Sequence, residues 1–403
     1  MTPLPRPAAA DGTRPQPPRS GRGLWAVPLA ALALLILVTI VVAALLPARL
    51  VASKEVERDG ETVSEDTPYA VVPASVEAVA DRVSYADLGA DVAVDTDPDG
   101  RVFFVTVSEP AQSVLGWWAS RDEPEIRFLT NEEKFGSQTP SQRRTIALQM
   151  MRTSSQVAQY VALTLAGYEP EQVPGPVQIE QMLCLDIEGQ SCVEYVPSAD
   201  QLDEGDTIVA VNGSDIDTID DLTAALEDNQ PGDTVPITVD RVDAGEVDVE
   251  VELMESPDEA GKAIVGFVPF DTTSVRLPFE IAFDTGEIGG PSAGLAFTLT
   301  LLDELTEGDL LGGNDIAVTG TMQLDGSVGP IGGLPQKVSA VRQAGIEHFI
   351  VPAGQSDADM ASAREIAGDD VELIVVANID EALAALERLG GDALPGEGMT
   401  PTP

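Results

Sequence analysis

An uninterrupted apolar run at residues 24–48 (LWAVPLAALALLILVTIVVAALLPA) constrains this chain most, because it contains no charged side chain. As a helix, these residues would extend roughly 38 Å, enough to cross a hydrocarbon core about 30 Å thick. A buried soluble helix is disfavoured, since no polar stripe marks a solvent face. The run therefore predicts a transmembrane helix.

Charges on either side of this run indicate its orientation. Arginine outnumbers aspartate in residues 1–23, whereas the chain becomes acidic after the run. The positive-inside rule then places residues 1–23, expected to be disordered, in the cytoplasm and the later domains outside the cell membrane. A cleaved signal peptide is the alternative, but the run is long for one and AALLP at residues 43–47 is a poor cleavage site.

The composition is strongly acidic. The 403 residues include 68 Asp+Glu against 22 Lys+Arg, a formal net charge of -46. Such a surface repels phosphates, so no nucleic-acid partner is expected. The charge is interpreted as a solvated surface, with steering of basic substrates as the alternative. The length predicts two or three domains.

Changes of pattern divide the rest of the chain. Strand patterns at 69–73 and 102–107, a helical pattern at 142–166 and alternating strands and helices after 262 indicate an α/β (α+β) protein. The strands expected after 262 begin with residues 263–268. The neighbouring pairs Trp117-Trp118 and Met150-Met151 are interpreted as core residues. The expected divisions are a linker at 49–67, an α/β region at 68–177, a β-rich domain at 178–258, a last domain at 262–390 and a flexible tail at 391–403.

Residues 205–213 (GDTIVAVNG) resemble PDZ domains, with Asn212-Gly213 forming the tight turn between two strands. A short helix is expected at 218–226. In that family the sheet edge beside a helix accepts a peptide C-terminus as an added strand, which implies binding of polypeptide C-termini here. The chain departs from the family because no Gly-Leu-Gly-Phe-type loop precedes Val193. A structural spacer with a PDZ fold is the alternative.

The chain has two cysteines, Cys184 and Cys192, on either side of a hairpin turn expected around Gly189. An exported location allows a disulfide between them. Two buried or free thiols are the alternative. No metal is expected, because two cysteines and the distant His348 do not make a ligand set. His348 is interpreted as structural, at the entry to a strand.

The chain offers few groups that could activate a nucleophile. Besides His348, its bases include four lysines, of which Lys337 stands in the apolar, glycine-rich run at 331–338. Upstream, Ser292 lies in the run GGPSAG at residues 289–294. Together they indicate a Ser-Lys dyad, in which the neutral amine removes the serine proton. This requires burial to lower the lysine pKa from about 10.4 towards about 7–8.

Ser292 also stands where a helix is expected to begin. Pro291 suits a first helical turn, and Gly290 lets a substrate backbone approach. Unpaired N–H groups at this helix start could form part of an oxyanion hole. The alternative is that Ser292 only caps the helix, a common role of serine. Local spacing favours neither.

Residues 263–390 resemble the proteolytic domain of the Lon family. The resemblance rests on GPSAG at 290–294 and GGLPQK at 332–337, with VTG at 318–320 and GSVGPI at 326–331 between them. It implies that Ser292 is the nucleophile, Lys337 the general base and Thr319 a hydrogen-bond neighbour of the lysine, supported by Gly290 and Pro291. The aspartate usual before the Gly-Pro-Ser run is replaced by Gly289.

The order of anchor, extra region, PDZ-like unit and Lon-type domain resembles the membrane-anchored PDZ–Lon proteases of bacteria. Full Lon proteases carry an ATPase module, but no Gly-x-x-x-x-Gly-Lys-Ser/Thr run occurs in this sequence. We therefore expect an ATP-independent, cofactor-free serine endopeptidase that cleaves exported or unfolded polypeptides selected by the PDZ-like domain. The resemblance also implies a homo-oligomer. The alternative is a non-catalytic PDZ scaffold that binds exported partners.

Overall fold

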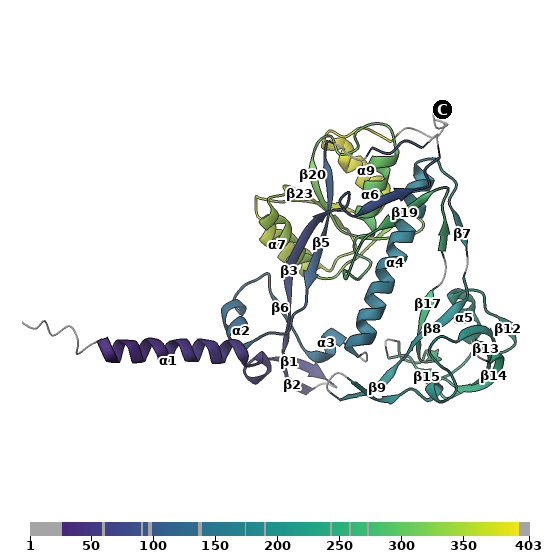
Figure 1. The fold of residues 1–403 in the computed structure, drawn as a ribbon, viewed down its shortest axis with the longest axis horizontal. Coiled ribbons are helices and arrows are strands. Elements are labelled where there is room, and N and C mark those ends of the chain that lie inside the picture. The colour runs from purple at the N-terminus through teal and green to yellow at the C-terminus, as the bar shows by residue number, and fades with distance from the viewer. Residues whose placement is uncertain are drawn as a thin grey trace, which may run out of the picture.

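The computed structural model describes residues 26–58, 61–89, 92–95, 99–135, 139–173, 175–188, 191–241, 244–257, 259–271 and 274–394. A long helix, α1 (Ala26–Leu45), projects from one end of a body with a larger and a smaller lobe (Figure 1). The stretch Val27–Leu45 is long and apolar enough to cross a membrane, a test that a signal sequence also passes. The predicted tail 1–23 lies outside the described residues, as does 395–403.

The larger lobe is built on a mixed sheet in the order β24-β23-β20-β5-β3-β6. Strands β5, β20, β23 and β24 run parallel, and β3 joins β5 antiparallel. Smaller antiparallel pairs, β4 with β19, β7 with β18 and β21 with β22, complete the lobe. The strands are β3 (Tyr69–Ala78), β4 (Val83–Ala86), β5 (Arg101–Ser108), β6 (Arg127–Leu129), β7 (Glu171–Val173), β18 (Ser274–Arg276), β19 (Glu280–Phe283), β20 (Asp315–Val318), β21 (Thr321–Met322), β22 (Val328–Gly329), β23 (His348–Pro352) and β24 (Glu372–Val376).

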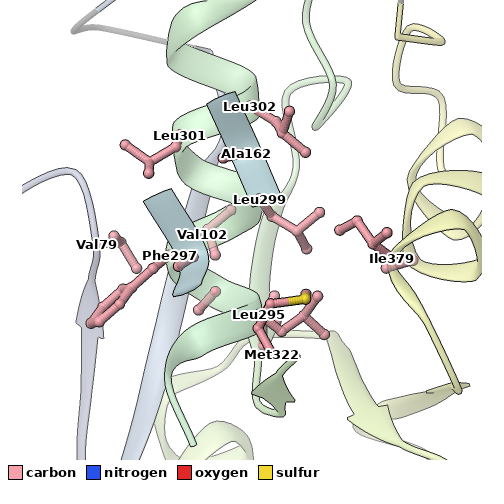
Figure 2. Packing of buried hydrophobic residues seen from close by; sticks show 14 of the residues in the cluster. Val79, Val102, Ala162, Leu295, Phe297, Leu299, Leu301, Leu302, Met322 and Ile379 are labelled. Carbon is pink, nitrogen blue, oxygen red and sulfur yellow. The ribbon is translucent and has the colours of Figure 1, made fainter. Parts of the chain in front are cut away.

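Helices cover both faces of this sheet. Strand side chains alternate: Phe104 and Val318 pack in one core cluster with α4, α6 and α9, whereas Val105 and Ala317 pack in another with α7 and α8. Figure 2 shows α6 in the first cluster, its leucines surrounded by residues from several segments. The helices are α2 (Val114–Ser120), α3 (Asn131–Phe135), α4 (Pro140–Leu165), α6 (Gly294–Leu305), α7 (Leu334–Ala344), α8 (Asp357–Ala367) and α9 (Ile379–Arg388).

The region 68–177 is not a separate unit, contrary to the sequence-based division. Its strand β5 pairs with β20, with Arg101 opposite Asp315, and its helix α4 packs in the same core as α6. The larger lobe is therefore formed by two stretches of the chain, and the smaller lobe is inserted between them.

The smaller lobe contains a sheet in the order β14-β13-β11-β8-β17, with β12 beside β11. It is the β-rich domain expected from the sequence, but its limits differ: the strand expected at 263–268 contributes β17 to this sheet, not to the last domain. Asn212 and Gly213 form the expected turn with φ of 53° and 77°. The elements are β8 (Val177–Met182), η3 (Pro197–Asp200), β11 (Thr207–Val211), β12 (Ser214–Asp215), α5 (Ile219–Leu226), β13 (Thr234–Arg241), β14 (Gly245–Glu252), β15 (Met254–Glu255), β16 (Ala263–Ile264) and β17 (Phe267–Asp271).

Cys184 and Cys192 form a disulfide, with their Cα atoms 5.7 Å apart. It joins the antiparallel strands β9 (Cys184–Glu188) and β10 (Ser191–Tyr195). Gly189, expected at the turn, lies outside the described residues.

Residues 49–67, expected to be a linker, contain regular structure. After the short turn η2 (Ala48–Leu50), β1 (Ser53–Arg58) and β2 (Glu61–Asp66) form an antiparallel hairpin. Alternation of polar side chains on an exposed hairpin gives no hydrophobic periodicity, so the sequence pattern resembles that of a linker.

Of the two neighbouring pairs interpreted as core residues, only Met151 is in the core, and Trp117 is half-buried. Met151 is buried, but Met150 is 47% exposed, and Trp118 is 60% exposed. Adjacent residues of a helix point about 100° apart, so both members of a pair rarely face the same core.

Candidate active site

Ser292 and Lys337 meet at the end of the larger lobe's sheet. The Nζ atom of Lys337 lies 2.7 Å from Oγ of Ser292, although 45 positions separate them in the sequence. Ser292 directly precedes Ala293, the N-cap of α6, and Lys337 lies in the first turn of α7. The alternative that Ser292 caps the helix is wrong, because Ala293 occupies the N-cap position.

The loop that carries Ser292 is held by one face of α4. The N–H of Gly290 donates to the carbonyl of Ala147 (2.6 Å), and Oγ of Ser154 donates to the carbonyl of Pro291 (2.9 Å). The φ of Gly290 is 94°, a conformation that favours glycine. Because its N–H is already bonded, Gly290 cannot supply it to an oxyanion. This role of α4 could not be predicted from the sequence, because hydrophobic periodicity alone indicates only a core helix.

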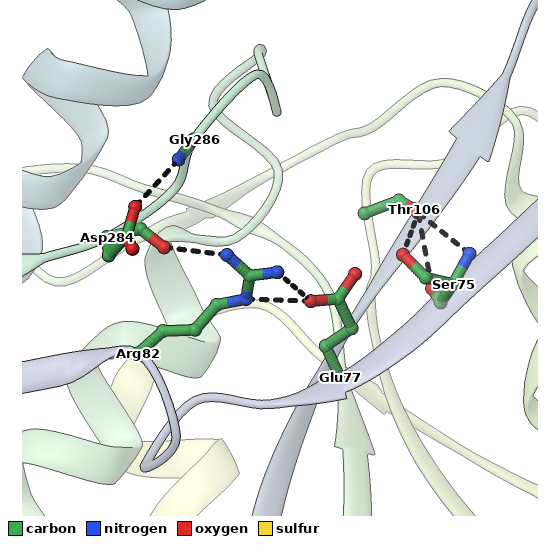
Figure 3. A network of polar contacts seen from close by, with 6 residues as sticks. All are labelled: Ser75, Glu77, Arg82, Thr106, Asp284 and Gly286. Atoms are coloured by element: carbon green, nitrogen blue, oxygen red, sulfur yellow. Dashed lines mark hydrogen bonds and ion pairs between the residues drawn. The ribbon is translucent and has the colours of Figure 1, made fainter.

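The same loop is fixed upstream by a polar network (Figure 3). Arg82 donates from Nε to Glu77 at 2.7 Å and from Nη1 to the carbonyl of Asp284 at 2.8 Å. The carboxylate of Asp284 accepts the N–H of Gly286 (3.2 Å). The chain is therefore anchored on both sides of the segment that leads to Ser292.

The side chain of Lys337 is shielded from solvent. Its side chain is buried, with 2% of the residue exposed, and burial lowers the pKa of Lys337 from its usual value near 10.5 to about 7. Its Nζ donates to Oγ1 of Thr319 (3.0 Å), which in turn donates to the carbonyl of Ser292 (3.1 Å). With the amine neutral, its lone pair is left to accept the Ser292 proton.

A cavity of about 350 Å³ opens at the dyad. The end of β5, the helix α4 and the loop before Ser292 form its walls, with apolar side chains from Val107, Met151 and Ile288. Such a cavity can hold a substrate side chain beside the hydroxyl.

The other candidates lie elsewhere. His348 is at the amino end of β23, where Nδ1 is 3.2 Å from a carboxylate oxygen of Glu372, whereas Lys337 and Thr319 lie at the carboxyl end of the parallel strands. Among the described residues, no group of three or more His, Cys, Asp or Glu is arranged to hold a metal ion.

Replacing Thr319 by valine should lower kcat by about 10- to 100-fold with little change in KM, because the lysine loses the acceptor that orients its lone pair. Thr319→Ser keeps the hydroxyl and should retain most activity. Steady-state kinetics on an unfolded protein check this; equal loss in both variants would contradict the role of the hydroxyl.

Gly289 replaces the aspartate of the family pattern, and the structure provides a reason. A Cβ added there would lie 2.7 Å from Cβ and 2.8 Å from the carbonyl carbon of Ala147. We expect Gly289→Asp to displace the serine loop, lowering kcat at least about tenfold and stability by about 1–3 kcal/mol. The control is Gly89→Asp, where an added Cβ meets no atom within 4 Å. Unchanged activity and melting temperature in Gly289→Asp would contradict this packing.

Comparison with known proteins gives two family matches, the Lon protease (S16) C-terminal proteolytic domain over residues 282–388 and the PDZ domain over residues 189–253. Ser292, Thr319 and Lys337 all lie within the first match. The Lon protease of Anaeromyxobacter dehalogenans is 33% identical over 141 residues, which is 32% of this chain and 16% of that protein. The peroxisomal Lon protease homolog 2 of Rattus norvegicus is 33% identical over 123 residues, 30% of this chain and 14% of that protein.

The chain therefore spans only about one sixth, or less, of the length of these two relatives. Among solved structures, the PDZ domain of the SdrC-like protein from Listeria monocytogenes is 20% identical, covering 24% of this chain and 88% of that chain, with a TM-score of 0.19.

Proposed function

Because the chain contains a Lon-type proteolytic domain and a PDZ domain, we propose that it is a membrane-anchored serine endopeptidase that works without ATP. Ser292 is the nucleophile and Lys337 the general base. The observation that carries this proposal is the 2.7 Å contact between a hydroxyl and a buried amine whose pKa is lowered to about 7.

In the proposed reaction, neutral Lys337 takes the proton of Ser292 as Oγ attacks the peptide carbonyl carbon. The tetrahedral intermediate collapses, the C–N bond breaks, and the lysine ammonium gives its proton to the leaving amine. Lys337 then takes a proton from water as the water oxygen attacks the acyl carbon. The C–Oγ bond breaks, the lysine ammonium returns the proton to Oγ of Ser292, and the acid product leaves. In the described structure the N–H groups of Ser292 and Ala293 have no hydrogen-bond partner, so they are candidates for the oxyanion hole.

Independence from ATP rests on the absence of a phosphate-binding motif from the 403 residues. An enzyme that cannot pull substrates apart should cut unfolded or flexible chains. The test is cleavage of casein by the full chain in detergent, with and without ATP, together with folded and unfolded forms of one substrate. Equal rates with and without ATP are expected. Stimulation by ATP would contradict this part of the proposal, and an inactive wild type would favour the scaffold alternative.

The anchor is α1, with the amino terminus in the cytoplasm and the proteolytic domain outside. Its length, its apolar composition and the arginines before it support this orientation. The test is whether the mature chain keeps the residues before Val27 and stays with membranes after alkaline washing. A soluble, shortened chain would indicate a signal peptide instead.

The smaller lobe is proposed to select substrates through a groove of about 680 Å³ between α5 and residues 259–269. Strand β17 is the last strand of its sheet in the described part of the chain, so its outer edge can pair with an extended peptide. Lys262 lies in the groove lining, where its Nζ is 3.0 Å from a carboxylate oxygen of Glu259, so a peptide carboxylate would compete with Glu259 for this positive charge.

Helix α4 connects this groove with the serine loop. Nε2 of Gln149 donates to the carbonyl of Pro269 on β17 (2.8 Å), two residues from Ala147, whose carbonyl holds Gly290. This connection supports an arrangement in which the smaller lobe presents chains to Ser292.

Blocking the groove should weaken selection and leave the dyad intact. Ala224 is exposed on α5 and lines the groove, so Ala224→Trp should reduce binding of a peptide with a free C-terminal carboxylate at least about tenfold. Asp228→Trp, outside the groove lining, is the matched control. Fluorescence anisotropy with free and amidated peptides checks this. Equal affinity of the wild type and Ala224→Trp, and of free and amidated peptides, would contradict this role of the groove.

A further inference from the structure

The junction between α1 and the body is part of the folded structure. The N–H of Ala48 donates to the carbonyl of Gln112 (2.8 Å), and the N–H of Val114 donates to the carbonyl of Leu46 (2.9 Å). Ala48 and Ala52 are buried. These bonds attach the end of α1 to the start of α2, so an ordered junction, and not a flexible linker, joins α1 to the body.

Several large apolar side chains are exposed at this junction. They come from two segments, the turn after α1 and the helix α2, which lies beside the end of α1 in Figure 1. Trp118 and Leu50 are each 60% exposed. We call this the junction surface, and it consists of Leu46, Leu50, Val51 and Trp118.

Two arginines accompany the junction surface. The guanidinium of Arg121 lies 5.7 Å from the ring centroid of Trp117 and 5.6 Å from that of Trp118, and its Nε is 3.4 Å from a carboxylate oxygen of the exposed Asp122. Arg49 is exposed between the buried Ala48 and the exposed Leu50. Tryptophan with a neighbouring cation is typical of the membrane–water boundary, where the ring meets the acyl chains and the charge reaches the phosphates.

We propose that the junction surface lies in the headgroup region of the bilayer that α1 crosses, and so holds the proteolytic lobe at a fixed height and orientation. The inference rests on the membrane anchor of the proposed function, and it does not depend on the catalytic dyad. α2 has seven residues, about 10 Å of helix, and begins at residues bonded to the end of α1, so Trp118 stays close to the boundary.

The partner that contacts the junction surface is a lipid surface rather than a protein, because α1 and the junction surface are continuous. Electrostatic attraction to anionic lipid cannot drive the contact, since the net charge of the chain is -46. Insertion of apolar side chains into the bilayer is then the driving force for the contact, which should form on neutral lipid and persist in high salt.

Tryptophan fluorescence tests this directly. The chain has three tryptophans, Trp25 before α1 and the pair at 117 and 118. A Trp25→Phe, Trp117→Phe variant of the full chain leaves Trp118 as the sole reporter. It is reconstituted in phosphatidylcholine vesicles whose acyl chains carry bromine either near the headgroup or near the bilayer centre.

We expect strong quenching of Trp118 by shallow bromine, weaker quenching by deep bromine, little quenching by aqueous iodide, and no change in high salt. The matched control carries Ser214→Trp on β12, in the smaller lobe far from α1, with all three native tryptophans replaced by phenylalanine (Figure 1). It should be quenched by iodide only. Vesicle flotation and casein cleavage are measured on the same samples.

Protein that floats with vesicles but shows Trp118 quenched by iodide and not by bromine would overturn the proposal while leaving the anchor and the protease in place. Protein that does not float would overturn both the anchor and this proposal. Loss of casein cleavage together with the expected flotation and quenching would contradict the catalytic dyad and support this proposal.

Discussion

Replacing Ser292 by alanine should lower kcat for cleavage of an unfolded protein by about 10⁴-fold or more. The other hydroxyl beside Lys337 Nζ, that of Thr319, is fully buried and donates to the carbonyl of residue 292, so it is not placed to form the acyl-enzyme. Lys337→Met should be as inactive, since the serine then has no base. The two residues act as a unit, so the double variant should be no worse than either single variant. Casein cleavage under steady-state conditions measures all three.

These losses should not come from unfolding. The backbone carbonyl of Ser292 still accepts hydrogen bonds from Thr319 and Gly320 in Ser292→Ala. Methionine is similar in length to lysine and suits a buried site, so Lys337→Met should keep the wild-type melting temperature or raise it. Cleavage that persists equally in every variant would identify another protease in the preparation, and full activity in either pure single variant would contradict the dyad.

Activity should fall about tenfold for each pH unit below about 7, because only the neutral form of Lys337 can take the serine proton. Burial lowers the pKa of Lys337 to about 7, so the amine is mostly neutral above that pH and mostly charged below it. We therefore expect kcat/KM to rise with pH and level off above about 8. Lys337→Arg keeps a permanent charge and should be inactive at every pH.

The pH profile of kcat/KM, measured over the range in which the fold is intact, checks this. Circular dichroism across the same range separates titration of the dyad from acid unfolding. A rate that is constant between about pH 5 and 8, or that levels off only above about pH 10, would show that the base is not a lysine with a lowered pKa.

Local motifs explain which parts could be predicted. The runs around Ser292 and Lys337 are short and specific, and the few bases in the chain left little else to consider, so the residues that meet at the site could be chosen from sequence. The turn at Asn212-Gly213 was predictable because these two adjacent residues favour it by themselves. The fold class was predictable because the spacing of apolar residues within each segment indicates a helix or a strand.

Long-range pairing was not predictable. Strand β5 finds its partner β20 more than two hundred residues later, and alternation of apolar residues states that a strand has a buried face without naming its neighbour. The role of α4 depends on the carbonyl of Ala147 and the hydroxyl of Ser154, groups that carry no distinctive pattern on a helix. The limits of the smaller lobe could not be predicted, because the sequence of β17 is equally compatible with a strand of either lobe.

The most direct test of this account is the pKa of the Lys337 amine. The chain contains four lysines, so ¹³Cε-lysine-labelled protein should give few side-chain NMR signals, and Lys337→Met identifies the one of interest. This assignment is needed because burial also lowers the pKa of Lys134. We predict that the Lys337 signal titrates near pH 7. A Lys337 signal that shifts only near pH 10, as for an ordinary lysine, would contradict the proposed base.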